Sequence, residues 1–186
     1  MRHCIVGLLA VCACLTLLRA ETDGSKGQLI EISTVTDTTN QSSAEMMNAF
    51  RAKIASRPSL FSLISNLDDS TGLVFEADCM TRDRPDAAYL CFYTSYYAGG
   101  VVKTALGSGM YASKSVDDVA DNLLASMAHD VAERWNSTLR SNAMQIVAAC
   151  LSLTQSSCAV SAPLTPELRS KVLKLAQSLQ KGGLQK

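Results

Sequence analysis

The chain has 186 residues, of which 47% are hydrophobic and 18% are charged, and its 17 basic side chains are balanced by 17 acidic ones. This length suits one domain of ordinary size, and the apolar content excludes intrinsically disordered and coiled-coil compositions. The charge balance argues against a protein that binds nucleic acid by electrostatic attraction, because such a protein normally carries a basic surplus.

Residues 1–20 predict a cleaved secretory signal peptide. A short basic start at Arg2 and His3 precedes an apolar run, Cys4–Leu18, which is shorter than the roughly 20 residues that a membrane-spanning helix needs. Ala20 provides a small residue at the cleavage point, and the sequence turns polar immediately after it. We therefore expect a secreted, extracellular protein whose mature chain has no membrane span.

The cysteines outside this leader predict a disulfide-bonded chain. Four remain, and an even number in a secreted protein is most simply explained by two disulfides, which have three possible connectivities. We expect local pairing, Cys79 with Cys91 and Cys150 with Cys158, and four buried reduced thiols are the alternative. The wide cysteine spacings, with His129 as the only remaining histidine, do not fit a zinc site.

Two asparagines begin an Asn-X-Ser/Thr triplet, the acceptor sequence for N-linked glycosylation: Asn40 and Asn136. Both triplets fit the secretory route, and together they predict a glycoprotein. Asn136 lies in a stretch with helical spacing, so its side chain must face solvent if it is to carry a sugar.

The mature chain divides by composition into three parts. Residues 21–42 are polar and rich in Ser and Thr, which predicts a poorly ordered lead-in with room for one short strand near residues 29–32. Residues 43–183 predict a helical domain, and residues 184–186 form a short tail. Residues 73–79 are ambiguous between a short helix and an extended segment.

Helical spacing of apolar residues recurs along the helical domain. Ser42 and Glu45 have the spacing of a capping box that begins a first helix, and Pro58 ends it and begins a second helix over residues 58–67. A third helix follows Pro85. Its aromatic residues recur at steps of three, one and three, which places four rings on one helix face: Tyr89, Phe92, Tyr93 and Tyr96.

The two clearest helices lie in the second half of the chain. Ser115 caps one of them, and its apolar stripe continues through Trp135. Thr165 and Pro166 begin the other, which Gly182 and Gly183 end. Alternating strand patterns are almost absent. The sequence therefore predicts an all-α fold, a single-domain bundle of five or six amphipathic helices stapled by disulfides.

No constellation of residues predicts catalysis or metal binding. His129 and Glu133 are spaced to share a metal, but no third ligand or nucleophile motif accompanies them. Residues 66–72 resemble a calcium loop, yet the glycine comes one residue late and the twelfth position is Ala77 instead of Glu. No phosphate-binding glycine motif is present. We expect a protein that is not an enzyme and that holds no cofactor.

These features support two hypotheses about function. The first is a secreted, non-enzymatic protein that acts through its surface, as a component of an extracellular matrix or secretion or as an effector that binds another protein or a second copy. The alternative is a carrier of small apolar molecules, with a cavity between helices. The four aromatic residues could line that cavity or a partner face, or they could be ordinary core. No nucleic-acid partner is expected.

Overall fold

The computed structural model describes residues 29–64, 72–99, 102–152 and 163–183. The predicted leader, most of the calcium-like turn and Cys158 lie outside these residues. Within them, five strands and three helices follow one another along the chain: β1 (Ile30–Val35), α2 (Gln41–Ala55), β2 (Phe61–Leu63), β3 (Gly72–Thr81), β4 (Tyr89–Gly99), β5 (Val102–Ser113), α3 (Val116–Ser152) and α4 (Pro166–Gly183).

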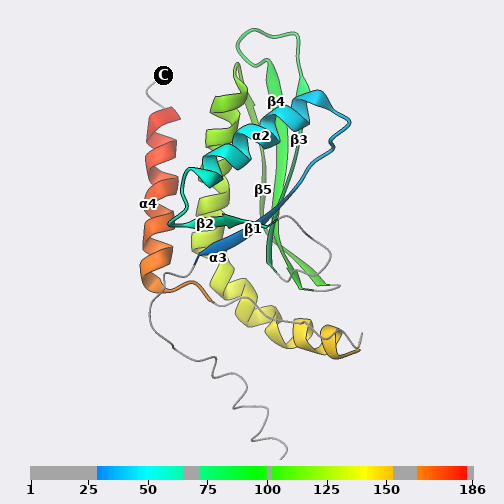
Figure 1. The fold of residues 1–186 in the computed structure, drawn as a ribbon, viewed down its shortest axis with the longest axis vertical. Helices are drawn as coiled ribbons and strands as arrows, with labels where there is room; N and C mark the ends of the chain where they lie inside the picture. Colours follow the sequence, from blue (N-terminus) through cyan, green and yellow to red (C-terminus); the bar gives the residue numbers. More distant parts are fainter. Residues whose placement is uncertain (1–28, 65–71, 100–101, 153–162, 184–186) are drawn as a thin grey trace, which may run out of the picture.

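The strands form one mixed sheet in the order β2-β1-β3-β4-β5 (Figure 1). β1 runs parallel to both of its neighbours, whereas β3, β4 and β5 form an antiparallel meander. The prediction of an all-α bundle is therefore wrong, and the fold is α/β. The short strand expected near residues 29–32 is present as β1, but it is longer than expected and is an inner strand of the sheet, so these residues are not part of a poorly ordered lead-in.

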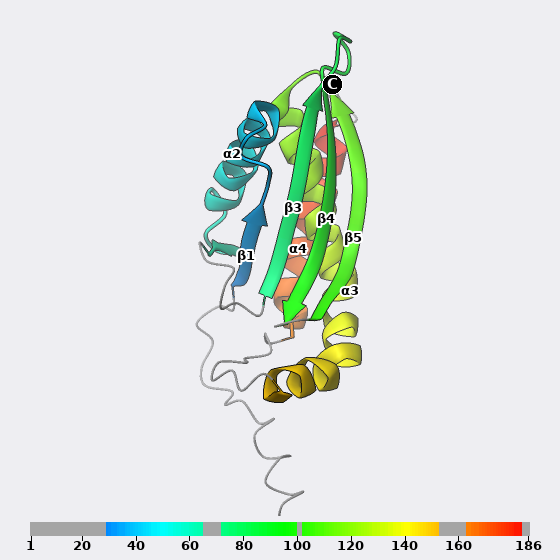
Figure 2. The ribbon, with the colours of Figure 1, turned by 90° about the vertical axis from the view of Figure 1, so that its right-hand side faces the viewer.

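The described helices lie on one side of the sheet. Figure 2 looks onto the opposite side, with α3 and α4 behind the strands. α2 and α3 pack against the sheet, and α4 packs against α3. Because side chains alternate along a strand, one set of strand residues points into the layer between sheet and helices. The main core is built there, from residues that include Ile32, Phe75, Tyr97, Leu123 and Val172. We call this side of the sheet the inner face and the other side the outer face.

The predictions for the two clearest helices are confirmed. The Asp118 backbone N–H donates to Ser115 Oγ at 3.1 Å, so Ser115 begins α3 as expected. The Leu168 N–H donates to Thr165 Oγ1 at 3.2 Å in the same way at the start of α4. The predicted stripe is buried from Ala120 to Trp135, and Val116 at its start is partly buried. These signals are local, and for that reason they could be found in the sequence.

The start of α2 differs from the predicted capping box. Asn40, not Ser42, is the N-cap, and its Oδ1 accepts hydrogen bonds from two backbone N–H groups of the first turn. Glu45 instead accepts a hydrogen bond from the Gln41 amide at 2.8 Å. The second predicted helix is also wrong, because the described part of residues 58–67 contains β2, in which Phe61 packs beside Ile30 of β1.

The third predicted helix is strand β4. Its residues alternate between the two faces of the sheet, and the ambiguous residues 73–79 belong to its neighbour β3. Steps of three and one between rings fit a helix, but the chain also carries Cys91, Tyr93, Ser95 and Tyr97 at period two. Strands on both sides supply the hydrogen bonds that an isolated segment lacks. That non-local pairing decides the structure of this segment.

Candidate functional site

β4 divides the predicted aromatic face between two environments. Tyr93 is buried on the inner face, and Tyr89 is partly buried against the same core. Phe92 lies on the outer face, where its side chain is 45% exposed. Tyr96 is also on the outer face, but it is only 7% exposed and packs with Val74 and Ala98 in a small buried cluster, with Lys103 Nζ 5.1 Å from its ring centroid. These rings therefore do not share one surface, and the helix face on which the carrier hypothesis rested does not exist.

A row of aromatic rings fills the inner face instead. Phe75 of β3 stacks on Phe50 of α2, with ring centroids 4.2 Å apart, and lies 5.5 Å from the ring of Tyr93. Tyr111 of β5 continues the row, 6.1 Å from Tyr93. The row crosses three adjacent strands and joins them to α2. It forms packed core, as aromatic rings in a protein interior usually do.

A buried carboxylate lies at the Tyr93 end of this row. Asp130 of α3 is only 7% exposed. Its Oδ2 atom accepts hydrogen bonds from the Tyr93 hydroxyl and from Ser95 Oγ, each at 3.2 Å. Beside it the hydroxyls of Tyr111 and Ser126 are hydrogen-bonded to each other. We call these five side chains the buried acid cluster. Its acid lies largely buried between sheet and helix.

Burial changes the proton affinities within the buried acid cluster. It raises the pKa of the Tyr93 hydroxyl to about 12, and the charge of Asp130 adds to that rise. Burial also raises the pKa of Asp130 above its ordinary value, although hydrogen bonds from Ser95 and Tyr93 and the charge of Arg134 act in the opposite direction. Because the folded state holds the Asp130 proton more tightly than the unfolded state does, this group stabilises the fold increasingly as pH falls.

We expect this linkage to be visible in an Asp130→Asn variant. The free energy of unfolding of the wild type, minus that of the variant, should rise as pH falls from 7 towards 4, because only the wild type gains from protonation. The exposed acids Asp37 and Glu167, whose pKa values are lowered, act alike in both proteins and cancel in the difference. Urea unfolding at several pH values measures it. A difference that is constant or that falls on acidification would contradict a raised Asp130 pKa.

Gly107 of β5 provides the space for this acid. A Cβ added there would overlap the Asp130 carboxylate. One turn further along α3, Arg134 Nη1 donates a hydrogen bond to the carbonyl of Leu106, the residue before Gly107. Leu106 is the extra residue of a β-bulge, because Ser95 and Tyr96 of β4 pair with Gly107 and Ala105. The glycine therefore allows the close approach of helix and strand that buries the acid.

We expect Gly107→Ala to lower the free energy of unfolding by about 2 kcal/mol or more, because the carboxylate must leave its hydrogen bonds or the helix must move. In an Asp130→Ala background, the same substitution should cost less than half as much. A double-mutant cycle by urea unfolding measures both values. Equal costs in the two backgrounds would show that the carboxylate is not the obstacle.

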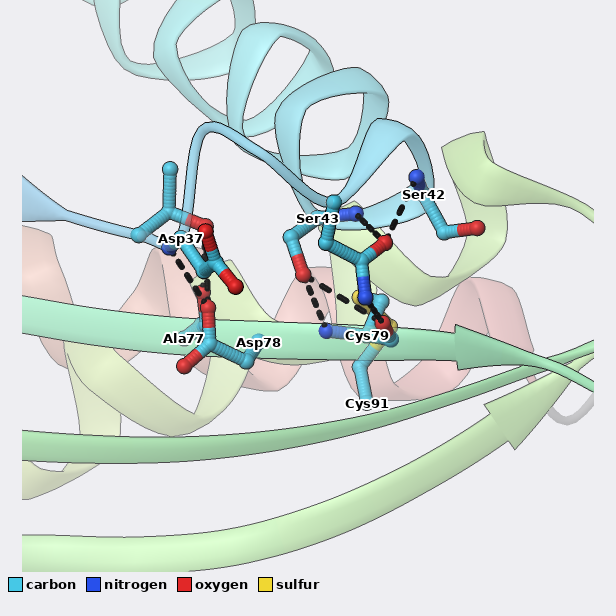
Figure 3. The surroundings of a disulfide bond; sticks show 9 residues. Asp37, Ser42, Ser43, Ala77, Asp78, Cys79 and Cys91 are labelled. Atoms are coloured by element: carbon cyan, nitrogen blue, oxygen red, sulfur yellow. Dashed lines mark hydrogen bonds between the residues drawn. A yellow bond between two sulfur atoms is a disulfide. The ribbon is translucent and has the colours of Figure 1, made fainter.

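A disulfide joins β3 to β4. Cys79 and Cys91 are direct cross-strand partners with Cα atoms 4.1 Å apart, and both are buried. This is the first of the two expected local pairs. The second, Cys150 with Cys158, falls outside the described residues except for the Cys150 backbone. Figure 3 shows that the bridge lies under the start of α2.

The first residues of α2 complete the edge of β3 beyond the end of β1. Ser43 Oγ accepts from the Cys79 N–H at 2.8 Å and donates to the Cys79 carbonyl at 3.3 Å. Asn40 Nδ2 donates to the same carbonyl at 3.0 Å. Nearby, Asp78 Oδ1 accepts from the Asp37 N–H at 2.8 Å (Figure 3). The disulfide and the N-cap therefore form one connected unit.

Both asparagines of the predicted glycosylation sites make structural hydrogen bonds. Asn40 caps α2 and bonds to β3, as described above. Asn136 bonds to the backbone of Leu164 at both ends of its amide: Nδ2 donates to the carbonyl at 3.1 Å, and Oδ1 accepts from the N–H at 2.7 Å. Glycosylation stays a prediction. A sugar attached to either Nδ2 replaces one of its two hydrogens, so the other hydrogen would have to make the hydrogen bond described here.

The two residues weighed as metal ligands, His129 and Glu133, lie four residues apart on α3. Glu133 pairs with Arg169, whose Nη2 lies 3.1 Å from both carboxylate oxygens, and His129 is exposed beside it on α3. Within the described ranges, no three His, Cys, Asp or Glu side chains are grouped to hold a metal ion. In the same ranges no helix is both long and apolar enough to cross a membrane.

The most unusual surface of the described residues lies on the outer face of the sheet. Met80, Phe92 and Met110, from three adjacent strands, are 49%, 45% and 57% exposed. Phe92 is the direct cross-strand partner of Met110, and Met80 pairs with the partly buried Leu90 beside it. We call these four residues the outer patch. Exposed apolar side chains that gather in one place often mark an interaction site, whereas single ones are ordinary.

Sequence reasoning found one residue of the outer patch and missed the others. Phe92 belongs to the aromatic set that the sequence suggests as a cavity lining or partner face, but no pattern in the sequence singles out Met80 or Met110. One signal could have joined Met80 to Phe92. Each directly follows a buried cysteine, Cys79 or Cys91, and neighbouring residues of a strand point to opposite faces, so both face away from the core. No known protein-family model matches the chain, and no curated protein matches its sequence.

Proposed function

We propose that this chain is a secreted, extracellular protein that acts by binding another protein through the outer patch, and not by catalysis. The observation that carries the proposal is the exposure of three large apolar side chains on adjacent strands of the outer face. Aromatic and methionine side chains are enriched in protein interfaces because they bury much area, and methionine adapts its shape to a partner.

The chemistry around the outer patch supports binding of a mixed surface. Asp78 lies next to Phe92 in the register of β3 and β4, and Thr94 and Ser108 follow on the same face. An apolar centre with polar groups around it is the usual anatomy of an interface. The acid of the buried acid cluster, by contrast, is only 7% exposed, which supports binding through the outer patch as the mode of action.

The secretory part of the proposal rests on the predicted leader and on the buried Cys79–Cys91 bridge. Disulfides persist in oxidising compartments. Mass spectrometry of the protein from the medium of the cells that make it tests this part. We expect an N-terminus close to Glu21 and a Cys79–Cys91 peptide without reduction, whereas a chain that starts at Met1 with alkylatable Cys79 and Cys91 would contradict secretion.

Photo-crosslinking tests the binding surface. A benzoylphenylalanine at position 92 should give a crosslinked adduct with one other protein from the secreted material, and the same group at Lys174, exposed on α4, should not. The identified protein, once purified, should bind wild type at least about tenfold more tightly than it binds Met80→Glu. Lys174→Glu is the matched control and should bind normally. An adduct with a second copy only, or equal binding by Met80→Glu, would contradict the proposal.

A further inference from the structure

β5 is an edge strand whose backbone is open for pairing. It closes the sheet on the side away from β1, and no strand among the described residues pairs with its far side. The opposite edge is β2, which has only three residues. Sheet edges in natural proteins are usually protected by shortness, charge, proline or a bulge. β5 has twelve residues, and only its first half carries such protection, in Lys103 and the bulge at Leu106.

The hydrogen-bond pattern identifies which groups face this free edge. The Cys79 N–H and carbonyl bond to Ser43 and Asn40, so they point away from β4. Cys79 and Cys91 are therefore a non-hydrogen-bonded pair, which fits their Cα separation of 4.1 Å. Because the pattern alternates, Cys91 directs its backbone groups to β5, where its partner is Tyr111.

The same alternation extends along β5. Tyr111, Gly109 and Gly107 direct their backbone groups to β4, so the residues between them direct theirs to the free edge. Those residues are Ser108, Met110 and Ala112, and all three are exposed. The stretch 107–113 contains no charged residue and no proline. It therefore presents three consecutive donor and acceptor pairs to a further strand.

A second copy of this chain matches this edge. Antiparallel pairing about a two-fold axis at Met110 places Met110 beside its own counterpart and Ser108 beside Ala112, so each of the three residues both donates and accepts. Lys103 lies near the start of the strand and Lys114 directly follows its end, and this register places neither opposite another lysine. It also brings Met110 and Phe92 of the two outer patches together into one apolar surface.

We propose that two copies of this chain associate through β5, antiparallel about a two-fold axis at Met110, and form one continuous sheet. This goes beyond the proposed function, because it needs no other protein and uses the edge of the sheet. An isologous contact of this kind is the commonest way in which identical chains pair. The strand of a different protein could use the same edge, and the experiment separates that case.

Sedimentation equilibrium of the purified wild-type protein over a concentration series should show a reversible change from the monomer mass to twice that mass. Met110→Glu and Met110→Lys should each weaken the dimer at least about tenfold, since like charges then face each other. An equimolar mixture of the two should form the dimer again, because the register places Glu opposite Lys. Met80→Glu and Met80→Lys, on the same face but away from the axis, should dimerise like wild type.

Circular dichroism should show native folding of both Met110 variants, whose altered side chain is mostly exposed. A wild-type protein that stays monomeric over the whole series would overturn the proposal, as would a dimer that tolerates both charges. A mixture that fails to dimerise would overturn the register. If the protein dimerises as described but the photo-crosslinking experiment gives no other partner protein, only the proposed function is contradicted.

Discussion

Phe75→Ala should lower the free energy of unfolding by about 4 kcal/mol, as is usual for removal of a buried phenylalanine ring. Phe75 is fully buried at the centre of the aromatic row, stacked between Phe50 and Tyr93. Its removal opens a cavity between α2 and the sheet, and the disulfide-linked strands on one side limit how far the site can collapse. Urea unfolding followed by circular dichroism measures the change.

Phe92→Ala is the matched control for this substitution. Phe92 lies on the neighbouring strand but on the outer face, and nearly half of its side chain is exposed. We expect a cost below about 1 kcal/mol, typical of surface positions. The sequence-based helix would have placed Phe92 on the same face as Tyr93 and predicted a comparable loss. Similar costs for Phe75→Ala and Phe92→Ala would contradict the two-faced sheet.

Removal of the Cys79–Cys91 bridge should cost about 3 kcal/mol, the value that loop-closure entropy gives for a cross-link of this span. The bridge joins residues 12 apart in sequence. It also fixes the β3 backbone that Ser43 and Asn40 bind. A Cys79→Ala/Cys91→Ala double variant should therefore unfold at a clearly lower urea concentration than the wild type.

Reductant provides the control for the double variant. Reductant should lower the free energy of unfolding of the wild type at least as much as the double substitution does. If reductant also destabilises the double variant, that further loss reports on Cys150 and Cys158. A loss below about 1 kcal/mol in the double variant would show that the strands need no bridge. Recovery of alkylated Cys79 from unreduced wild type would show that the bridge is absent.

The sequence predicted those parts of the fold whose signals are local. α3 and α4 begin at Ser115 and Thr165 as expected, because a cap and a helical stripe can be recognised within one segment. β4 was wrongly predicted as a helix. Tyr89, Tyr93 and Tyr97 are four apart, a spacing compatible with both a helix and a strand, and only the pairing with β3 and β5 selects the strand.

The candidate site was harder to predict than the fold. Asp130 lies three residues after Met127 on the apolar side of α3, and an acid in that position is a signal of a buried polar group. Its partners Tyr93 and Ser95 are on a strand 35 or more residues away, so no local pattern joins them. The outer patch likewise depends on how β3, β4 and β5 pair. A prediction of helices for these segments gives no such pairing and therefore cannot place the patch.

The end of the outer face that carries Met80, Phe92 and Met110 is exposed, and methionine oxidation tests this most directly. Brief treatment of the native protein with hydrogen peroxide, followed by peptide mass spectrometry, compares residues of one chemistry within one molecule. We predict rapid oxidation of Met80 and Met110 and protection of Met46, Met47 and Met127, which are fully buried. Protection of Met80 and Met110 to the level of the buried methionines would contradict the account.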